Sequence, residues 1–296
     1  MKKVLVMGGT MFFGKRLVEK LLQQGMEVTI ATRGRTADPF ADRVERLVID
    51  RENRETLEAA FRGRSWDVVY DQTCYSPQEA LDTKEILDGR IGRYIFTSTM
   101  AVYDHGSGKR EEDFDPRAYA VGKLGDRRAY IGVAGYQEAK RASEAVLLTN
   151  PAFPVVAIRF PLVIGPDDFT NRLRFHVEHI AREIPMGISN PDNYVDFISS
   201  EDAARTLAWL GESDVVGPFN ASSHGEMRLR ELVGMIEELV GKKAILVPEA
   251  GPGHDSPYAM PGSWSLCIDK IKQAGFAPSH VRDWLPSLLA GYLSQL

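Results

Sequence analysis

Two tyrosine–lysine pairs in this chain of 296 residues have a spacing that suits acid–base chemistry. Tyr119 is followed by Lys123, and Tyr136 is followed by Lys140. Residues four apart lie on the same face of a helix, so each lysine would stand one turn from its tyrosine. A free tyrosine titrates at about pH 10, too high for a general base near neutrality, but a neighbouring ammonium group stabilises the phenolate. Either pair could therefore exchange a proton with a substrate oxygen.

The first strand and turn, VLVMGGTMFFG from Val4 to Gly14, have the features of a dinucleotide site. A short apolar run ends at two glycines, and a helical pattern follows from Lys15. The start of such a helix offers free N–H groups and a positive dipole end to a pyrophosphate. The usual spacing of three glycines is interrupted, because Met11 stands at the middle position. We expect the cofactor to bind at Gly8, Gly9, Thr10, Met11, Phe12, Phe13 and Gly14.

The residues after the second predicted strand, Glu27 to Ala31, indicate which dinucleotide binds. NAD sites commonly place an acidic side chain here for the ribose 2′-OH, whereas NADP sites place arginine nearby for the 2′-phosphate. This chain has Thr32, followed by Arg33 and Arg35. The sequence therefore favours NADP, with NAD as the second option.

The alternation of strands and helices predicts an α/β fold with a doubly wound parallel sheet of the Rossmann type. Ligands of such a sheet lie beyond the carboxyl ends of the strands. Asp50 follows the third predicted strand and could contact the adenine amino group or cap the helix that starts near Asn53. Thr97 ends the fifth predicted strand and Thr99 follows it, where we expect the chemistry to occur. We expect Thr97 to contact the cofactor.

Composition limits the classes of protein and site. With 44% hydrophobic and 26% charged residues the chain is typical of globular proteins, and its net charge of −5 gives no general attraction to nucleic acid. No stretch approaches the roughly 18 apolar residues of a membrane span. Cys74 and Cys267 have no metal-ligand spacing and predict a reducing cytoplasm. His176 and His179 lack a third ligand in view, so no metal site is expected.

These motifs together resemble the extended, or atypical, short-chain dehydrogenase/reductase superfamily of NAD-dependent epimerases, dehydratases and reductases. The resemblance covers nearly the whole chain, and GGTMFFG has the GGxxxxG form of an atypical subgroup. The other segments that carry it are FTSTMAVY, YQEAK, IRFPLVIGP, YVDFISSEDAA and GPFNAS. The resemblance implies that Thr99 orients a substrate oxygen, that a tyrosine of the YxxxK signature exchanges its proton, and that the lysine hydrogen-bonds the nicotinamide ribose. Asn220 of GPFNAS would line the substrate pocket.

Context selects Tyr136 over Tyr119 as the signature tyrosine. Tyr119 lies 20 residues after Thr99 and Tyr136 lies 37 residues after it, and the usual family spacing falls between, slightly closer to the first. Only Tyr136 opens a long predicted helix that leads into the strand Val155 to Phe160, and only Lys140 has a glutamate, Glu144, one turn later. We predict that Tyr136 and Lys140 are catalytic and that Tyr119 is a pocket or lid residue of an insertion.

The substrate is less well specified. Arg172 could bind an anionic group of a sugar-like substrate, or it could be solvated. Thr99 is followed by Met100 and Ala101, without the acidic pair that some sugar dehydratases carry, which favours a reductase or epimerase.

We expect residues 1–165 with 195–225 to form the NAD(P)-binding domain and residues 166–194 with 226–296 to form a smaller mixed α/β substrate domain. The rival hypothesis is a cofactor-binding regulatory or RNA-associated protein of the same fold without turnover. The acidic charge balance disfavours an RNA partner. The resemblance leaves a homodimer open.

Overall fold

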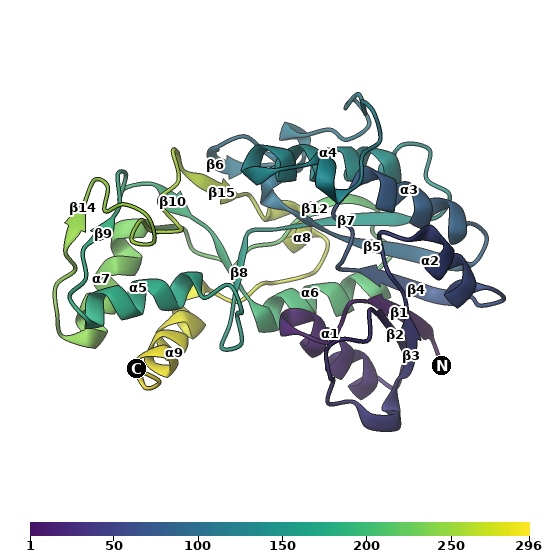
Figure 1. Ribbon diagram of the computed structural model, residues 1–296, viewed down its shortest axis with the longest axis horizontal. Helices are drawn as coiled ribbons and strands as arrows, with labels where there is room; N and C mark the ends of the chain where they lie inside the picture. Colours follow the sequence, from purple (N-terminus) through teal and green to yellow (C-terminus); the bar gives the residue numbers. More distant parts are fainter.

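The computed structural model describes residues 1–296 and is built on a seven-stranded sheet (Figure 1). The strand order is β12-β7-β5-β4-β1-β2-β3, and every neighbouring pair is parallel. The strands are β1 (Lys3–Met7), β2 (Glu27–Thr32), β3 (Glu45–Val48), β4 (Trp66–Asp71), β5 (Ile91–Thr99), β7 (Val155–Phe160) and β12 (Gly217–Asn220). This arrangement confirms the predicted doubly wound α/β class.

The sheet is covered by helices on both faces, which explains its nearly continuous apolar strands. Successive side chains of a strand point to opposite faces, so Val4 and Val6 pack into one core while Leu5 and Met7 pack into another. The first core includes α1 (Phe12–Gln23) and α6 (Ser200–Glu212). The second includes α2 (Arg54–Phe61), α3 (Pro77–Ile86) and α4 (Gly132–Leu148). Figure 1 shows these two groups of helices on either side of the sheet.

The chain reverses direction across the sheet between β1 and β4. From β1 it proceeds outward through β2 to β3, then returns to β4 on the other side of β1. Such a topological switch point leaves a crevice at the carboxyl ends of the strands, because the connections on either side turn away from each other. The glycine turn after β1 lies at this point.

The C-terminal part forms a further core around α5 (Arg172–Ala181), α7 (Leu229–Val240) and α9 (Val281–Leu293), grouped at the end of the molecule away from α2 (Figure 1). A four-stranded sheet of order β13-β10-β15-β6 and two strand pairs, β11 with β8 and β14 with β9, complete this part. The remaining strands and α-helix are β6 (Gly106–Lys109), β8 (Leu162–Ile164), β9 (Met186–Gly187), β10 (Tyr194–Val195), β11 (Phe197–Ser199), β13 (Met227–Arg228), β14 (Leu246–Val247), β15 (Trp264–Leu266) and α8 (Asp269–Gln273). Four short 3-10 helices, η1 (Ala41–Arg43), η2 (Met100–Val102), η3 (Glu111–Asp113) and η4 (Arg127–Ala129), lie in the connections. The domain boundaries at 165, 195 and 225 stay a prediction.

Two local features differ from the sequence-based expectation. The apolar run YVDFI predicts one short strand, but the structure divides it at Asp196, whose carboxylate accepts a hydrogen bond from the Leu266 N–H at 2.7 Å. The chain thereby changes its strand partner from β15 to β8. Asp50 does not cap α2, because Asn53 takes that position and accepts a hydrogen bond from the Glu55 N–H at 3.1 Å.

Candidate active site

A cleft of about 550 Å³ opens at the carboxyl ends of the sheet strands. It runs from the end of β2 past the glycine turn to the start of α5. Eleven of the predicted cofactor residues line it, in addition to Lys140: Gly8, Gly9, Thr10, Met11, Phe12, Phe13, Thr32, Arg33, Arg35, Asp50 and Thr97. Gly14 lies behind the turn, where a Cβ atom would stand 2.3 Å from the Gln72 side-chain oxygen.

The glycine turn packs in a way that only glycine permits. Gly8 has a φ of +104° and Gly9 a φ of +91°, which side chains rarely adopt. A Cβ atom on Gly9 would lie 2.9 Å from a methyl group of Val18 in α1. Met11 is the N-cap of α1, and its side chain makes no capping hydrogen bond. The first N–H groups of α1 therefore have no side-chain partner and can receive an anion.

Three polar atoms of the cleft lining are buried without a hydrogen-bond partner: the hydroxyl of Thr97, the side-chain nitrogen of Gln72 and Nε of Arg51. Buried polar groups are normally paired, so these atoms are suited to a polar ligand. Together with the open end of α1, they fit a dinucleotide that crosses the switch point.

The cleft carries more cationic than anionic side chains. Its carboxylates are Asp50 and Glu52, both just after β3, and its cationic side chains are Arg33, Arg35, Arg51, Arg127, Lys140 and Arg172. Arg51 and Arg127 are paired with buried carboxylates behind the lining, and the other four cations are not. Arg33 and Arg35 are exposed, and no carboxylate lies within ion-pair distance of either. An excess of positive charge at the end of β2 suits a phosphate group.

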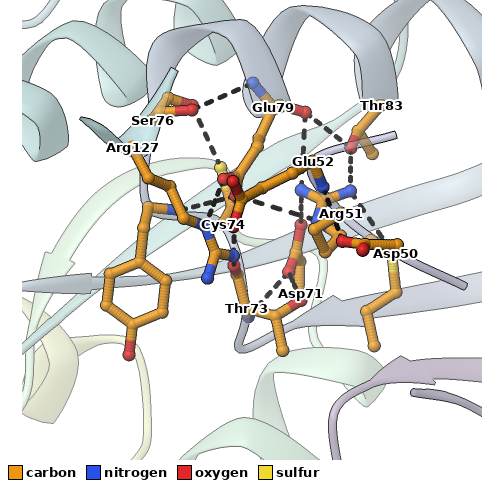
Figure 2. Close-up of polar contacts among 12 residues, drawn as sticks. Asp50, Arg51, Glu52, Asp71, Thr73, Cys74, Ser76, Glu79, Thr83 and Arg127 are labelled. Carbon is orange, nitrogen blue, oxygen red and sulfur yellow. Dashed lines mark hydrogen bonds and ion pairs between the residues drawn. The ribbon is translucent and has the colours of Figure 1, made fainter. Parts of the chain in front are cut away.

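One wall of the cleft contains a buried polar network (Figure 2). Arg51 donates hydrogen bonds to Asp71 at 2.8 Å and to the Thr83 hydroxyl at 2.5 Å. Figure 2 shows Arg51 between these two residues, with Arg127 approaching Glu79 from the opposite side. The buried Glu79 carboxylate accepts a hydrogen bond from Arg127 at 3.0 Å. The network joins β3, β4, α3 and the segment that precedes α4 into one fixed wall.

Tyr136, Lys140 and Thr99 meet at the other end of the cleft. Lys140 is only 4% exposed, and its ammonium group donates to the carbonyls of Cys74 at 2.8 Å and Thr97 at 2.9 Å. Two of its three N–H groups are thus used, and one is left for a ligand. Burial raises the pKa of the Tyr136 phenol, and hydrogen bonding with the Thr99 hydroxyl partly offsets this. The phenol is therefore protonated near neutrality before any ligand binds.

The register of α4 against the sheet is fixed by a second buried network. Glu144, two turns after Tyr136, accepts hydrogen bonds from the Ser98 hydroxyl in β5 and from Arg159 in β7. Ser98 directly precedes Thr99. The same network therefore holds the helix that carries Tyr136 and the strand that carries Thr99.

Two residues expected in the substrate pocket lie outside the cleft lining. Tyr119 packs against Phe114, with ring centroids 5.7 Å apart. Asn220 is fully buried, accepts a hydrogen bond from the Tyr103 hydroxyl at 2.8 Å, and donates to the carbonyl of Lys109. The structure thus brings Tyr136 to the cleft and not Tyr119. Arg172 does line the cleft, and its side chain donates to the Thr170 hydroxyl at 3.0 Å.

Tyr75 and Arg127 also line the cleft, and neither is among the residues predicted from the sequence. Tyr75 could have been predicted to line the cleft, because it follows a sheet strand at the edge of the sheet where ligands bind. Arg127 could not have been predicted, because it comes from the polar segment before α4, whose path over the cleft depends on tertiary contacts.

A model of the NAD dependent epimerase/dehydratase family matches residues 4–221 of the chain. The chain belongs to this family. Membership confirms the predicted class of NAD-dependent enzymes, whereas the GGxxxxG subgroup and the preference for NADP stay predictions. None of the helices combines the length and the apolar composition of a membrane span.

Two curated proteins of Arabidopsis thaliana are similar in sequence to this member of the family. The chloroplast stem-loop binding protein of 41 kDa b is 31% identical over 42% of this chain and 36% of its own length. UDP-glucuronic acid decarboxylase 1 is 25% identical over 99% of this chain and 70% of its own length. The chain thus spans about a third of the first relative and about two thirds of the second.

The fold is shared with a solved family structure. A UDP-glucose 4-epimerase of Thermus thermophilus in complex with NAD superposes with a TM-score of 0.72 and 19% identity, over 99% of this chain and 100% of that chain. This likeness extends over both the sheet and the C-terminal part, and it confirms the predicted Rossmann-type fold.

Proposed function

We propose that the chain is an NADP-dependent oxidoreductase or epimerase that acts on a hydroxyl or carbonyl group of a small, sugar-like substrate. The observation that carries the proposal is the meeting of Tyr136, Lys140 and Thr99 at one end of a cleft whose other end holds the glycine turn and Arg33. An acid–base group and a dinucleotide site would then share one cavity, which is what transfer of a hydride and a proton requires.

Different residues of the cleft would bind different parts of the cofactor. The open N-terminus of α1 would receive the pyrophosphate, and the arginines after β2 would pair with a ribose 2′-phosphate. The free N–H of Lys140 and the unpaired Thr97 hydroxyl are suited to the nicotinamide ribose. When bound, the nicotinamide would accept or give the hydride at the reacting carbon.

Tyr136 would exchange the proton at the substrate oxygen. In the reducing direction its neutral phenol donates the proton to the oxygen of the new hydroxyl group, and in the oxidising direction the ionised phenol accepts it back. The Lys140 ammonium group, one helical turn away, would stabilise the ionised form by charge attraction. The Thr99 hydroxyl lies next to the phenol and would hydrogen-bond the same substrate oxygen.

The distribution of carboxylates favours simple hydride transfer over dehydration. Elimination of water needs an acid near the leaving group and a base near the departing proton. The cleft's two carboxylates, Asp50 and Glu52, follow β3, on the adenine side of the glycine turn in our proposal. A reductase or an epimerase needs no such acid beside Tyr136.

The charge of the cleft supports an anionic substrate. Arg172 lies at the substrate end, without an ion-pair partner, and its positive charge acts on Tyr136. The similar proteins named above include enzymes of UDP-glucuronic acid and UDP-glucose, both nucleotide sugars with a diphosphate group. We propose that Arg172 binds an anionic group of a sugar-like substrate of this kind.

Cofactor titration followed by a substrate screen tests the proposal. NADPH should raise the melting temperature of the chain more than NADH. At least one UDP-sugar should be reduced with NADPH, or oxidised or epimerised with NADP⁺. The same substrate should not turn over with the Tyr136→Phe variant. Absence of any shift with both dinucleotides would refute the cofactor assignment.

An RNA-associated role is the alternative that one observation favours, the likeness to a stem-loop binding protein. The net charge of −5 speaks against it, and the shared stretch covers only 42% of this chain. Retention of the full chain on stem-loop RNA at physiological salt would support this alternative, and free passage would reject it.

A further inference from the structure

Tyr75 is an aromatic residue of the cleft that the proposed function leaves without a role. It follows β4 at the switch point of the sheet and lines the cleft, with 44% of its surface exposed. A half-exposed aromatic ring in a cleft offers a flat face on which a ligand ring can pack. The surroundings of the ring show which ligand that would be.

The backbone at Tyr75 is rigidly held. Its N–H donates to the buried Glu79 carboxylate at 2.9 Å. The next residue, Ser76, caps α3 by accepting a hydrogen bond from the Glu79 N–H at 3.3 Å, and Pro77 occupies the first position of the helix. A capped helix start with proline at its first position has little conformational freedom. The ring therefore projects from a fixed point.

Arg127 supports the ring from the segment that precedes α4. Its guanidinium group is bound to both oxygens of Glu79, by the hydrogen bonds from Nε and Nη2, and donates to the Thr73 carbonyl at 2.5 Å. Its central carbon lies 4.9 Å from the centre of the Tyr75 ring. A cation at this distance attracts the ring by its quadrupole. Glu79 thus fixes both the backbone of Tyr75 and the cation that packs on its side chain.

The ring stands beside the groups assigned to the nicotinamide end of the cofactor. The Lys140 ammonium nitrogen lies 5.0 Å from the centre of the Tyr75 ring, and the Tyr136 ring centroid lies 6.3 Å away. Neither Arg33 nor Arg35 contacts this part of the cleft through any ion pair or ring contact. The exposed surface of Tyr75 therefore belongs to the reactive end of the site and not to the 2′-phosphate end.

We propose that Tyr75 is a specificity-determining residue whose ring forms the wall against which the nicotinamide and its ribose pack, with Arg127 holding the ring in place. This inference rests on the proposed function, because it requires a nicotinamide dinucleotide in the cleft. It adds that recognition of the nicotinamide half depends on an aromatic side chain from the loop after β4.

A comparison of binding affinities for the whole dinucleotide and for its adenine half distinguishes a contact of Tyr75 with the nicotinamide half from a purely structural role of Tyr75. The full chain and its variants would be titrated with NADPH and with 2′,5′-ADP, which lacks the nicotinamide and its ribose. Tyr75→Ala should weaken NADPH binding by about tenfold, the value of a lost aromatic contact, and leave 2′,5′-ADP binding unchanged. Tyr75→Phe should recover most of the loss, because the aromatic surface is kept.

Arg128→Ala is a control on the segment that carries Arg127. Arg128 has an 83% exposed side chain, pairs only with Glu52 at 3.4 Å, and does not line the cleft. It should change neither titration. If NADH proves the tighter ligand of the wild type, NADH and ADP form the corresponding pair of probes.

Two results would overturn the inference while leaving the proposed function intact. An equal loss of NADPH and 2′,5′-ADP binding in Tyr75→Ala would show that the side chain merely supports the fold of the cleft. Unchanged NADPH binding would show that the ring does not contact the nicotinamide half. A wild-type chain that binds neither dinucleotide would refute the proposed function itself, and the inference with it.

Discussion

Glu144 and Arg159 form an ion pair in which Oε2 and Nη2 lie 2.6 Å apart and both side chains are fully buried. The five N–H groups of the arginine all have partners in Glu144, the Tyr103 hydroxyl, and the carbonyls of Glu111 and Phe114. The pair links α4, β7 and the segment after β5. It therefore connects the helix that carries Tyr136 to β7, the strand that pairs with the Thr99 strand β5.

Loss of one partner of this pair should strongly destabilise the fold. Arg159→Met leaves the Glu144 carboxylate buried without its cation, which should cost about 3–5 kcal/mol of unfolding free energy. The double variant Arg159→Met/Glu144→Leu should be less destabilised than the sum of the single variants, because no unpaired charge remains. Urea denaturation of the three variants measures both values. Strictly additive losses would argue against coupling between the two residues.

Tyr136→Phe should lower turnover by about 10²–10⁴-fold, the usual contribution of a positioned proton donor, and leave dinucleotide binding intact. Steady-state kinetics on the substrate found by screening measures the first value, and fluorescence titration measures the second. Tyr119→Phe serves as the control, because Tyr119 packs on Phe114 outside the cleft lining. Activity that survives in Tyr136→Phe and disappears in Tyr119→Phe would reverse the assignment.

The dependence of kcat on pH should follow the ionisation of the Tyr136 phenol. Burial raises the pKa of this group, so the neutral phenol that donates a proton during reduction persists through neutral pH. Oxidation uses the ionised phenol, and its kcat should therefore increase as the pH rises. Reduction should slow at high pH for the same reason. Rate profiles in both directions, recorded between pH 6 and about 10, test this, and flat profiles would exclude Tyr136 as the titrating group.

Removal of the charges after β2 should change the choice of cofactor. The double variant Arg33→Ala/Arg35→Ala should weaken NADPH binding by about 10–100-fold, the value of charge-assisted hydrogen bonds to a phosphate, with NADH binding unchanged. Arg62→Ala is a control, since Arg62 is exposed and does not line the cleft. Equal effects on NADPH and NADH would mean that these arginines do not bind the 2′-phosphate.

Asp196 should make the fold less stable as the pH rises. Burial raises the pKa of its carboxyl group to about 7 from an ordinary value of 3.8. The folded state therefore favours the protonated form, and this contribution is complete below pH 3.8 and is lost as the pH rises towards 7. The loss amounts to at most about 4 kcal/mol. Asp196→Asn should flatten the dependence of unfolding free energy on pH in this range, and an unchanged slope would contradict the assignment.

The sheet strands could be predicted because their apolar runs are long and end in glycine, proline or polar residues. Val155 to Phe160 was predicted with the bounds that the structure has. The glycine turn, Tyr136 and Lys140 could be predicted to line one cleft for the same reason, since local spacing fixes their geometry. Asn220 was placed in the substrate pocket by resemblance alone, and its burial depends on Tyr103 and Lys109, which lie more than a hundred residues earlier. Arg127 was missed for the corresponding reason, because its partner Glu79 lies 48 residues earlier.

A structure of the chain with bound NADP would test the central claim most directly, through the distance from the nicotinamide ring to each of the two tyrosines. We predict a dinucleotide across the glycine turn, with the adenine ribose beside Arg33, the ribose of the nicotinamide beside Lys140, and the Tyr136 hydroxyl facing the nicotinamide. A nicotinamide that faces Tyr119 instead, or a dinucleotide bound outside this cleft, would contradict the account.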